Sequence, residues 1–132
     1  MKYLLDTHVV LWTLLKTNKI NKKVVSIIEN QSNQIYVSAI SFWEISLKYS
    51  LGKIDLNNVD PSIFPDIVTE MGFQVLSLKS EEAANYHQLK GKWHRDPFDR
   101  MIISICLKND LVLITKDENI KKYKEEGLTT LW

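Results

Sequence analysis

Short apolar runs alternate with longer stretches of helical periodicity along the whole chain, and this alternation limits the fold more than any other feature. Apolar runs bounded by polar residues predict buried strands at residues 3–5, 35–37, 73–78 and 111–114, and a short edge strand at 129–131. Apolar residues three and four positions apart predict helices at residues 9–16, 22–29, 40–51, 62–71, 81–90 and 97–108. Parallel strands need crossover connections, which helices usually supply. We therefore expect an α/β fold, a three-layer sandwich with a mostly parallel, twisted sheet of four to five strands and helices on both faces.

The size and charge of the chain exclude several classes of protein. The 132 residues contain no linker or repeat, so we expect a single domain, 1–132. Lys and Arg total 17 against 16 Asp and Glu, and the net charge of +1 gives no general attraction to nucleic acid or anionic membranes. The single cysteine, Cys106, excludes an internal disulfide framework and a cysteine-based zinc site. Without a signal peptide or a long apolar run, the chain is expected to be cytoplasmic and to have no membrane partner.

Acidic residues stand where the predicted strands end. Asp6 follows the first strand, and Asp117 follows the fourth. Glu44 lies little more than one turn into the helix after the second strand, and Asp99 lies at the start of the last long helix. Ligands of open α/β sheets bind beyond the carboxyl ends of the strands, so we expect the four carboxylates to meet there.

Each acid also has a purely structural interpretation. Asp6, Asp96 and Asp117 stand where a helix N-cap is expected, and Asp96 precedes Pro97, which suits the first helical position. Glu44 stands four residues before Lys48, the favourable order for a surface ion pair. Carboxylates gathered without a counter-ion would repel one another, so the set as a whole suggests a metal site. Hard oxygen ligands suit Mg²⁺ or Mn²⁺ better than zinc.

The motifs around these acids resemble the PIN domain, and within it the VapC-type toxin ribonucleases of bacterial toxin–antitoxin pairs, including the PilT-like branch. The resemblance covers nearly the whole chain and rests on D-T-H at 6–8, W-E at 43–44, H-R-D-P-F-D-R at 94–100 and L-V-L-I-T-K-D at 111–117. It implies a PIN-like fold and a Mg²⁺ or Mn²⁺ site that hydrolyses RNA phosphodiester bonds. Its catalytic and metal-binding acids would be Asp6, Glu44, Asp99 and Asp117. The resemblance also implies a homodimer and a cognate antitoxin protein.

Residues around the acids are expected to support the site or to contact RNA. Thr7, Asp96 and Thr115 are candidates for support by hydrogen bonding, although a Thr at a strand end is more often structural. Positive and aromatic side chains precede and flank Asp99 and are expected to bind substrate: Lys92, Trp93, His94, Arg95 and Arg100. Trp93 is alternatively a core or interface aromatic, and a catalytic role of His8 or His94 is left open.

Two other functions are compatible with parts of this pattern. A non-catalytic PIN-like scaffold would bind RNA or protein without cutting, and only the intact set of acids argues against it. A receiver-type phosphoacceptor domain also places acids around Mg²⁺, but it needs an acidic pair after its first strand, where this chain has Thr7 and His8 after Asp6. The sequence therefore favours a divalent-metal-dependent endoribonuclease, the toxin of a type II toxin–antitoxin pair.

Overall fold

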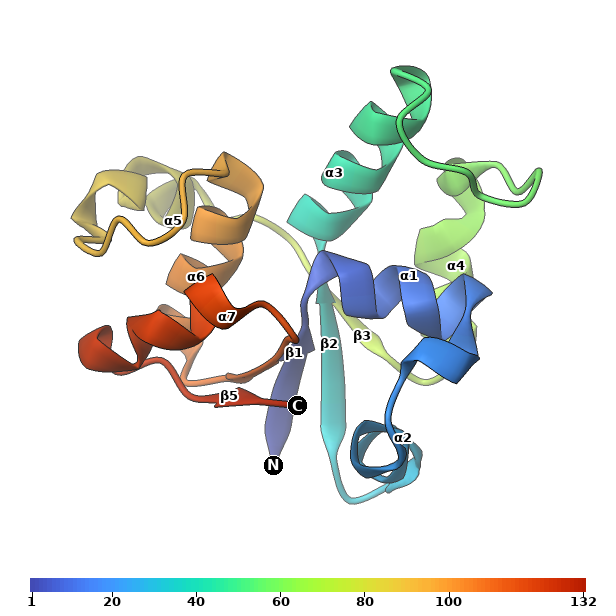
Figure 1. Cartoon of the computed structure of the whole chain (residues 1–132), viewed down its shortest axis with the longest axis horizontal. Coiled ribbons are helices and arrows are strands. Elements are labelled where there is room, and N and C mark those ends of the chain that lie inside the picture. The colour runs from blue at the N-terminus through green and yellow to red at the C-terminus, as the bar shows by residue number, and fades with distance from the viewer.

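The computed structural model describes all 132 residues and contains one sheet of five strands (Figure 1). The strands are β1 (Lys2–Leu5), β2 (Gln34–Ser38), β3 (Gln74–Leu76), β4 (Val112–Ile114) and β5 (Thr130–Leu131). They lie in the order β3-β2-β1-β4-β5, and every neighbouring pair is parallel. A receiver-type domain has the order 2-1-3-4-5, so the strand order argues against that alternative.

Helices cover both faces of the sheet. Seven α-helices connect the strands: α1 (Thr7–Leu15), α2 (Lys22–Glu29), α3 (Ala39–Ser50), α4 (Phe64–Glu70), α5 (Ser80–Ala84), α6 (Pro97–Asn109) and α7 (Glu118–Lys121). Figure 1 shows α1, α2 and α4 on one side and α5, α6 and α7 on the other, with α3 continuing from the end of β2. The expected three-layer α/β sandwich is confirmed. None of these helices has both the length and the apolar character needed to cross a membrane.

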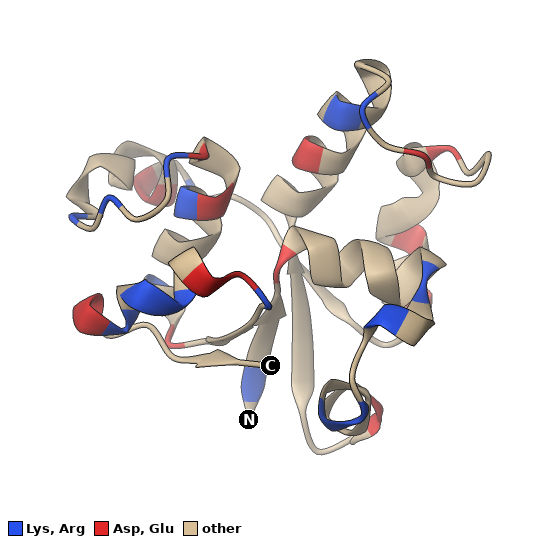
Figure 2. Cartoon of the chain, in the orientation of Figure 1, with Lys and Arg blue, Asp and Glu red and all other residues tan.

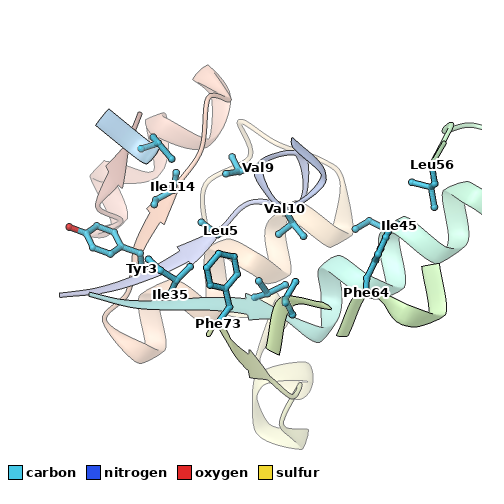
Figure 3. Close-up of a cluster of buried hydrophobic side chains, with 13 residues drawn as sticks. Tyr3, Leu5, Val9, Val10, Ile35, Ile45, Leu56, Phe64, Phe73 and Ile114 are labelled. Carbon is cyan, nitrogen blue, oxygen red and sulfur yellow. The ribbon is translucent and has the colours of Figure 1, made fainter. Parts of the chain in front are cut away.

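Two apolar cores fill the spaces between the sheet and its helices. Because neighbouring residues of a strand point to opposite faces, Leu5 of β1 packs into one core and Leu4 into the other. The first core lies under α1, α2 and α4, and Figure 3 shows its side chains converging from the strands and these helices. The second core is dominated by α6, whose Ile102, Ile103 and Ile105 are buried. This packing fixes the first turn of α6 relative to the ends of the strands.

The segment before α6 differs from the predicted helix 81–90. The helix ends at Ala84, a short 3-10 helix covers Tyr86–Gln88, and residues 89–96 form an irregular loop. The carbonyl groups of Leu89 and Gly91 accept hydrogen bonds from the Arg100 guanidinium. These bonds replace the backbone hydrogen bonds that a continued helix would make. The predicted strand 73–78 is likewise shorter, because β3 is an edge strand that pairs with β2 over only three residues.

Asp96 begins α6, and its capping role gives a testable expectation. Its side chain accepts hydrogen bonds from the backbone N–H groups of Phe98 at 2.8 Å and Asp99 at 3.3 Å. Asn retains the accepting oxygen but not the charge, so Asp96→Ala should be less stable than Asp96→Asn by about 1 kcal/mol. Urea unfolding of the two variants measures this difference. Equal free energies of unfolding would show that the cap contributes nothing.

Candidate active site

Four carboxylates from distant parts of the sequence lie at the carboxyl end of the sheet. Asp6 directly follows β1, and Glu44 lies in α3, the helix that begins at the end of β2. Asp99 lies in the first turn of α6, and Asp117 directly precedes α7. Figure 2 shows acidic stretches where β1 meets α1, on α3, at the start of α6 and ahead of α7.

Side chains that could hold a metal ion form two overlapping groups that share Asp99. One ligand atom from each of Glu44, Asp96 and Asp99 lies within 4.8 Å of the others, and the same holds for His94, Asp99 and Asp117. Of the four acids that the sequence predicted to meet, these groups contain Glu44, Asp99 and Asp117, whereas Asp6 lies in neither group. The groups also contain Asp96, expected mainly as a helix cap, and His94, expected on the substrate side.

Asp6 is held at one oxygen and unpartnered at the other. Its side chain is 3% exposed, and Oδ2 accepts a hydrogen bond from the hydroxyl of Thr115 at 2.7 Å. Oδ1 is buried and has no hydrogen-bond partner. Although Asp6 occupies the N-cap position of α1, its side chain makes no capping bond. Burial raises the pKa of this carboxyl despite the hydrogen bond from Thr115, so the capping interpretation does not account for Asp6.

Glu44 is the most deeply buried of the acids. It is 1% exposed, Oε2 is paired with the ammonium of Lys48, and Oε1 has no partner. The ion pair expected from the four-residue spacing is present, but it joins a half-exposed lysine to a buried carboxylate. Burial acts to lower the pKa of Lys48, but Glu44, followed by Asp96 and Asp99, raises it above its usual value. Lys48 thus supplies positive charge beside the cluster, a role that the spacing alone did not reveal.

Asp99 lies where the negative charges meet. Burial first, and then the neighbouring charge of Asp6, raise its pKa from 3.8 to about 7, although His94 acts in the opposite direction. Nε2 of His94 lies 3.1 Å from Oδ2 of Asp99. A carboxyl with this pKa is easily ionised by a nearby cation, because the cation offsets both the burial and the repulsion.

Asp117 is both a helix cap and a member of the cluster. Oδ1 accepts hydrogen bonds from the N–H groups of Asn119 and Ile120 at the start of α7. Oδ2 faces Nε2 of His94 at 3.1 Å. Burial acts to raise the pKa of Asp117, but the Ile120 N–H and His94 outweigh it and lower the pKa. One oxygen thus positions the side chain and the other is directed at the site.

Two threonines connect the elements that carry the acids. Thr115 donates to Asp6 and accepts a hydrogen bond from the N–H of Asp117 at 3.1 Å, so it ties the end of β4 to both acids. The buried hydroxyl of Thr7 lies 2.9 Å from that of Ser41, which links α1 to α3. Ser41 was not expected from the sequence, because no local pattern marks a contact between residues 34 positions apart.

The donor set fits a divalent metal ion. The carboxylate oxygens are hard ligands of the kind that Mg²⁺ and Mn²⁺ prefer. Two of these oxygens, on Asp6 and Glu44, are buried without any partner, which is costly unless a cation satisfies them. The residues present therefore match the cofactor that the sequence suggested.

The residues expected to contact RNA fall into two groups. Lys92 and Arg95 are exposed, and together with His94 they line a hollow of about 270 Å³ next to the acids. Trp93 is half-buried and packs edge-on against Tyr123, with ring centroids 4.9 Å apart, as its alternative interpretation suggested.

The Arg100 guanidinium is engaged within the protein. It donates to the carbonyl groups of Leu89, Gly91 and His94 and to the hydroxyl of Tyr123. These bonds fix the loop 89–96, which carries His94. The structure therefore gives Arg100 a scaffolding position beside the site.

The raised pKa of Asp99 makes the stability of the metal-free protein depend on pH. Between pH 4 and 7 the folded protein keeps a proton on Asp99 that the unfolded chain has already lost, so each rise in pH favours unfolding. The melting temperature of the metal-free protein should therefore fall across this range. Asp99→Asn removes the titration, so its melting temperature should fall less and exceed that of the wild type at about pH 8. Thermal unfolding in EDTA measures both proteins, and identical pH profiles would contradict this expectation.

Comparisons with known proteins agree with this architecture. A structure of VapBC2 from Rickettsia felis bound to a DNA fragment from their promoter matches with a TM-score of 0.69 and 19% identity, over 99% of this chain and 98% of that chain. VapBC-1 from nontypeable Haemophilus influenzae matches with a TM-score of 0.67 and 21% identity, over 99% and 97%. VapBC-5 from Mycobacterium tuberculosis, a member of the VapBC family of toxin-antitoxin systems, matches with a TM-score of 0.56 and 12% identity, over 98% and 95%.

Likeness at these identities shows the fold, and the family follows from the sequence itself. No curated protein matches the chain. The profile of the PIN domain matches residues 3–126, which include all four acids at the end of the sheet. The chain therefore belongs to the PIN domain family.

Proposed function

We propose that this chain is a divalent-metal-dependent endoribonuclease that acts as a single PIN-like domain, residues 1–132. The observation that carries the proposal is the pair of buried, unpartnered carboxylate oxygens on Asp6 and Glu44. They belong to a carboxylate cluster at the end of the sheet where α/β folds bind ligands. Most buried polar atoms have a hydrogen-bond partner, and neither helix capping nor the ion pair with Lys48 provides one for these two oxygens.

The catalytic and metal-binding residues in this proposal are Asp6, Glu44, Asp99 and Asp117, with Mg²⁺ or Mn²⁺ as the cofactor. A bound divalent ion supplies positive charge for the scissile phosphate and lowers the pKa of a water molecule. Thr115 orients Asp6 through its hydroxyl and Asp117 through the backbone N–H. Asp96 aligns the first turn of α6, and Thr7 keeps α1 against α3.

The substrate side of the proposal rests on the exposed cations next to the acids. Lys92 and Arg95 would hold RNA phosphates, since charge neutralisation supplies most sequence-independent affinity for nucleic acid. Trp93 and Arg100 would act mainly by shaping the loop, because both are packed against Tyr123. The near-zero net charge means that these local cations carry the contact.

We further propose a toxin of a type II toxin–antitoxin pair, present in the cytoplasm as a homodimer and held inactive by a cognate antitoxin. The likeness in fold to VapBC structures supports this role. An exposed apolar face on α3 also supports a protein partner, because Trp43, Leu47 and Leu51 are spaced four residues apart and are 59%, 39% and 58% exposed.

Incubation of a mixed RNA pool with the purified protein tests the enzymatic proposal. We expect cleavage with Mg²⁺ or Mn²⁺, none with EDTA, and none by Asp6→Asn, whose amide lacks the charge that holds a cation. Equal cutting by the wild type and Asp6→Asn would identify a contaminating nuclease. Binding of RNA without cutting, by a protein that binds Mn²⁺, would favour the non-catalytic scaffold.

A further inference from the structure

A histidine nitrogen stands among the carboxylates on one side of the cluster. Nε2 of His94 lies 3.1 Å from Oδ2 of Asp99 and 3.1 Å from Oδ2 of Asp117. The imidazole is 17% exposed. Its backbone is fixed as well, because the His94 carbonyl accepts from Arg100 at 3.2 Å and its N–H donates to the Tyr123 hydroxyl at 3.3 Å. The ring is therefore held in place by the loop that carries it.

The distances from the His94 nitrogen to the two carboxylate oxygens suit a shared cation. Ligand atoms that lie about 2.1 Å from an ion, at right angles, are about 3 Å apart. Both distances from the His94 nitrogen match this separation, and without an ion the same spacing serves as hydrogen bonds. Oδ1 of Asp117 caps α7 and so fixes the orientation of the side chain. Oδ2 is therefore positioned in the metal-free protein.

An independent feature next to the triad is an unsatisfied carboxylate oxygen. Oδ1 of Asp6 is buried and makes no hydrogen bond. Asp6 and Asp117 line the same hollow of about 270 Å³, together with Lys116, and the charge of Asp6 also acts on Asp99. The carboxylate of Asp6 therefore lies beside the triad. The triad thus has a buried carboxylate next to it, one oxygen of which no group of the protein satisfies.

We propose that His94 is a direct metal ligand, which together with Asp99 and Asp117 forms a nitrogen-containing cation site that prefers Mn²⁺ to Mg²⁺. The inference rests on the metal-dependent function proposed above and assigns one ligand and a preference to it. Imidazole suits transition-metal ions, whereas Mg²⁺ keeps oxygen ligands and waters. His94 then belongs to the metal centre, and the neighbouring Lys92 and Arg95 bind the RNA.

Pulsed electron paramagnetic resonance of the full chain loaded with Mn²⁺ tests the ligand directly. The wild type should show the ¹⁴N coupling of a directly bound imidazole, and His94→Gln should lose it. The chain has three histidines, so His8→Gln and His87→Gln provide matched controls that should keep the coupling. His8 lines the hollow beside Asp6, and loss of the signal in His8→Gln alone would overturn the assignment.

Isothermal titration calorimetry tests the preference of the site for Mn²⁺ over Mg²⁺. The wild type should bind Mn²⁺ at least about tenfold more tightly than Mg²⁺, and His94→Gln should remove most of this ratio, mainly by weakening Mn²⁺. Equal affinities of the wild type for the two ions would overturn the preference. The melting temperature of His94→Gln in EDTA reports whether the variant is folded. If it is not, absence of nitrogen coupling in the wild type still refutes the proposal.

These outcomes separate the inference from the proposed function. RNA cleavage by a wild-type protein whose bound Mn²⁺ shows no nitrogen coupling would refute the histidine ligand and retain the nuclease. Nitrogen coupling without any RNA cleavage would retain the metal site and refute the nuclease. If the protein bound no Mn²⁺ at all, both proposals would be wrong.

Discussion

Asp99→Asn is expected to reduce metal-dependent RNA cleavage by more than about a hundredfold. Asp99 is the one residue shared by both groups of candidate ligands, so its amide would weaken the binding of an ion by either group. Loss of partners that only orient metal ligands typically costs 10–100-fold, and loss of a shared ligand should cost more. Initial rates on a fixed RNA substrate, measured over a range of Mn²⁺ concentrations, give the size of the effect and show whether excess metal restores activity.

Asp110→Asn provides the matched control for this substitution. Asp110 ends the same helix, is exposed, and adopts a left-handed conformation with φ of 52°, which Asn tolerates well. Its cleavage rate should stay within about twofold of the wild type, because surface changes of this kind have small effects. A melting temperature of Asp99→Asn at or above that of the wild type at about pH 8 would show that its loss of activity does not come from unfolding. Retention of a tenth or more of the wild-type rate would contradict a ligand role for Asp99.

Arg100→Met is expected to lower the free energy of unfolding by about 3 kcal/mol. The guanidinium donates hydrogen bonds to Leu89, Gly91, His94 and Tyr123, and Met retains much of the aliphatic length but none of the donors. A hydrogen bond from a charged group contributes roughly 1.5–3 kcal/mol, and bonds made by one side chain are not additive. Urea unfolding measures the loss of stability. The same variant should also bind Mn²⁺ more weakly, because the loop that carries His94 loses its support.

Arg95→Met tests whether this loss is specific to Arg100. Arg95 lies in the same loop and is exposed, so its removal should change the free energy of unfolding by less than about 0.5 kcal/mol. It should instead weaken RNA binding in low salt, because its charge faces the solvent beside the acids. Similar losses of stability in the two variants would show that the guanidinium bonds contribute little.

The sheet and the convergence of the acids could be predicted because they follow from local patterns and one rule of topology. The run 111–114 is apolar and lies between Asp110 and Thr115, and Asp117 comes soon after it. All parallel strands end at one edge of the sheet, so acids that follow different strands lie along the same edge, and they meet where their strands are neighbours. The order itself, with β1 in the centre, depends on packing between distant segments and was not predicted.

Structural and functional roles of single residues are harder to separate from the sequence, because one side chain can have both. Asp117 caps α7 with one oxygen and faces His94 with the other, so capping and participation in the site are compatible. Arg100 looked like an RNA contact because it is a cation next to Asp99. Its partners are carbonyl groups of a loop whose conformation has no periodic signature, and hydrogen bonds of this kind cannot be inferred from spacing.

The separation of the interior into two cores gives a bound ion a mechanical role. Asp6 precedes α1, whose Val9 and Val10 pack on one face of the sheet, whereas Asp99 lies in the first turn of α6, whose Ile102 packs on the other. An ion held by both acids would link the two helical layers at the carboxyl end of the sheet. Removal of the ion by a chelator would then allow each layer to unfold locally by itself. Proteolytic cleavage of the metal-free protein should therefore begin in the helices nearest this end of the sheet.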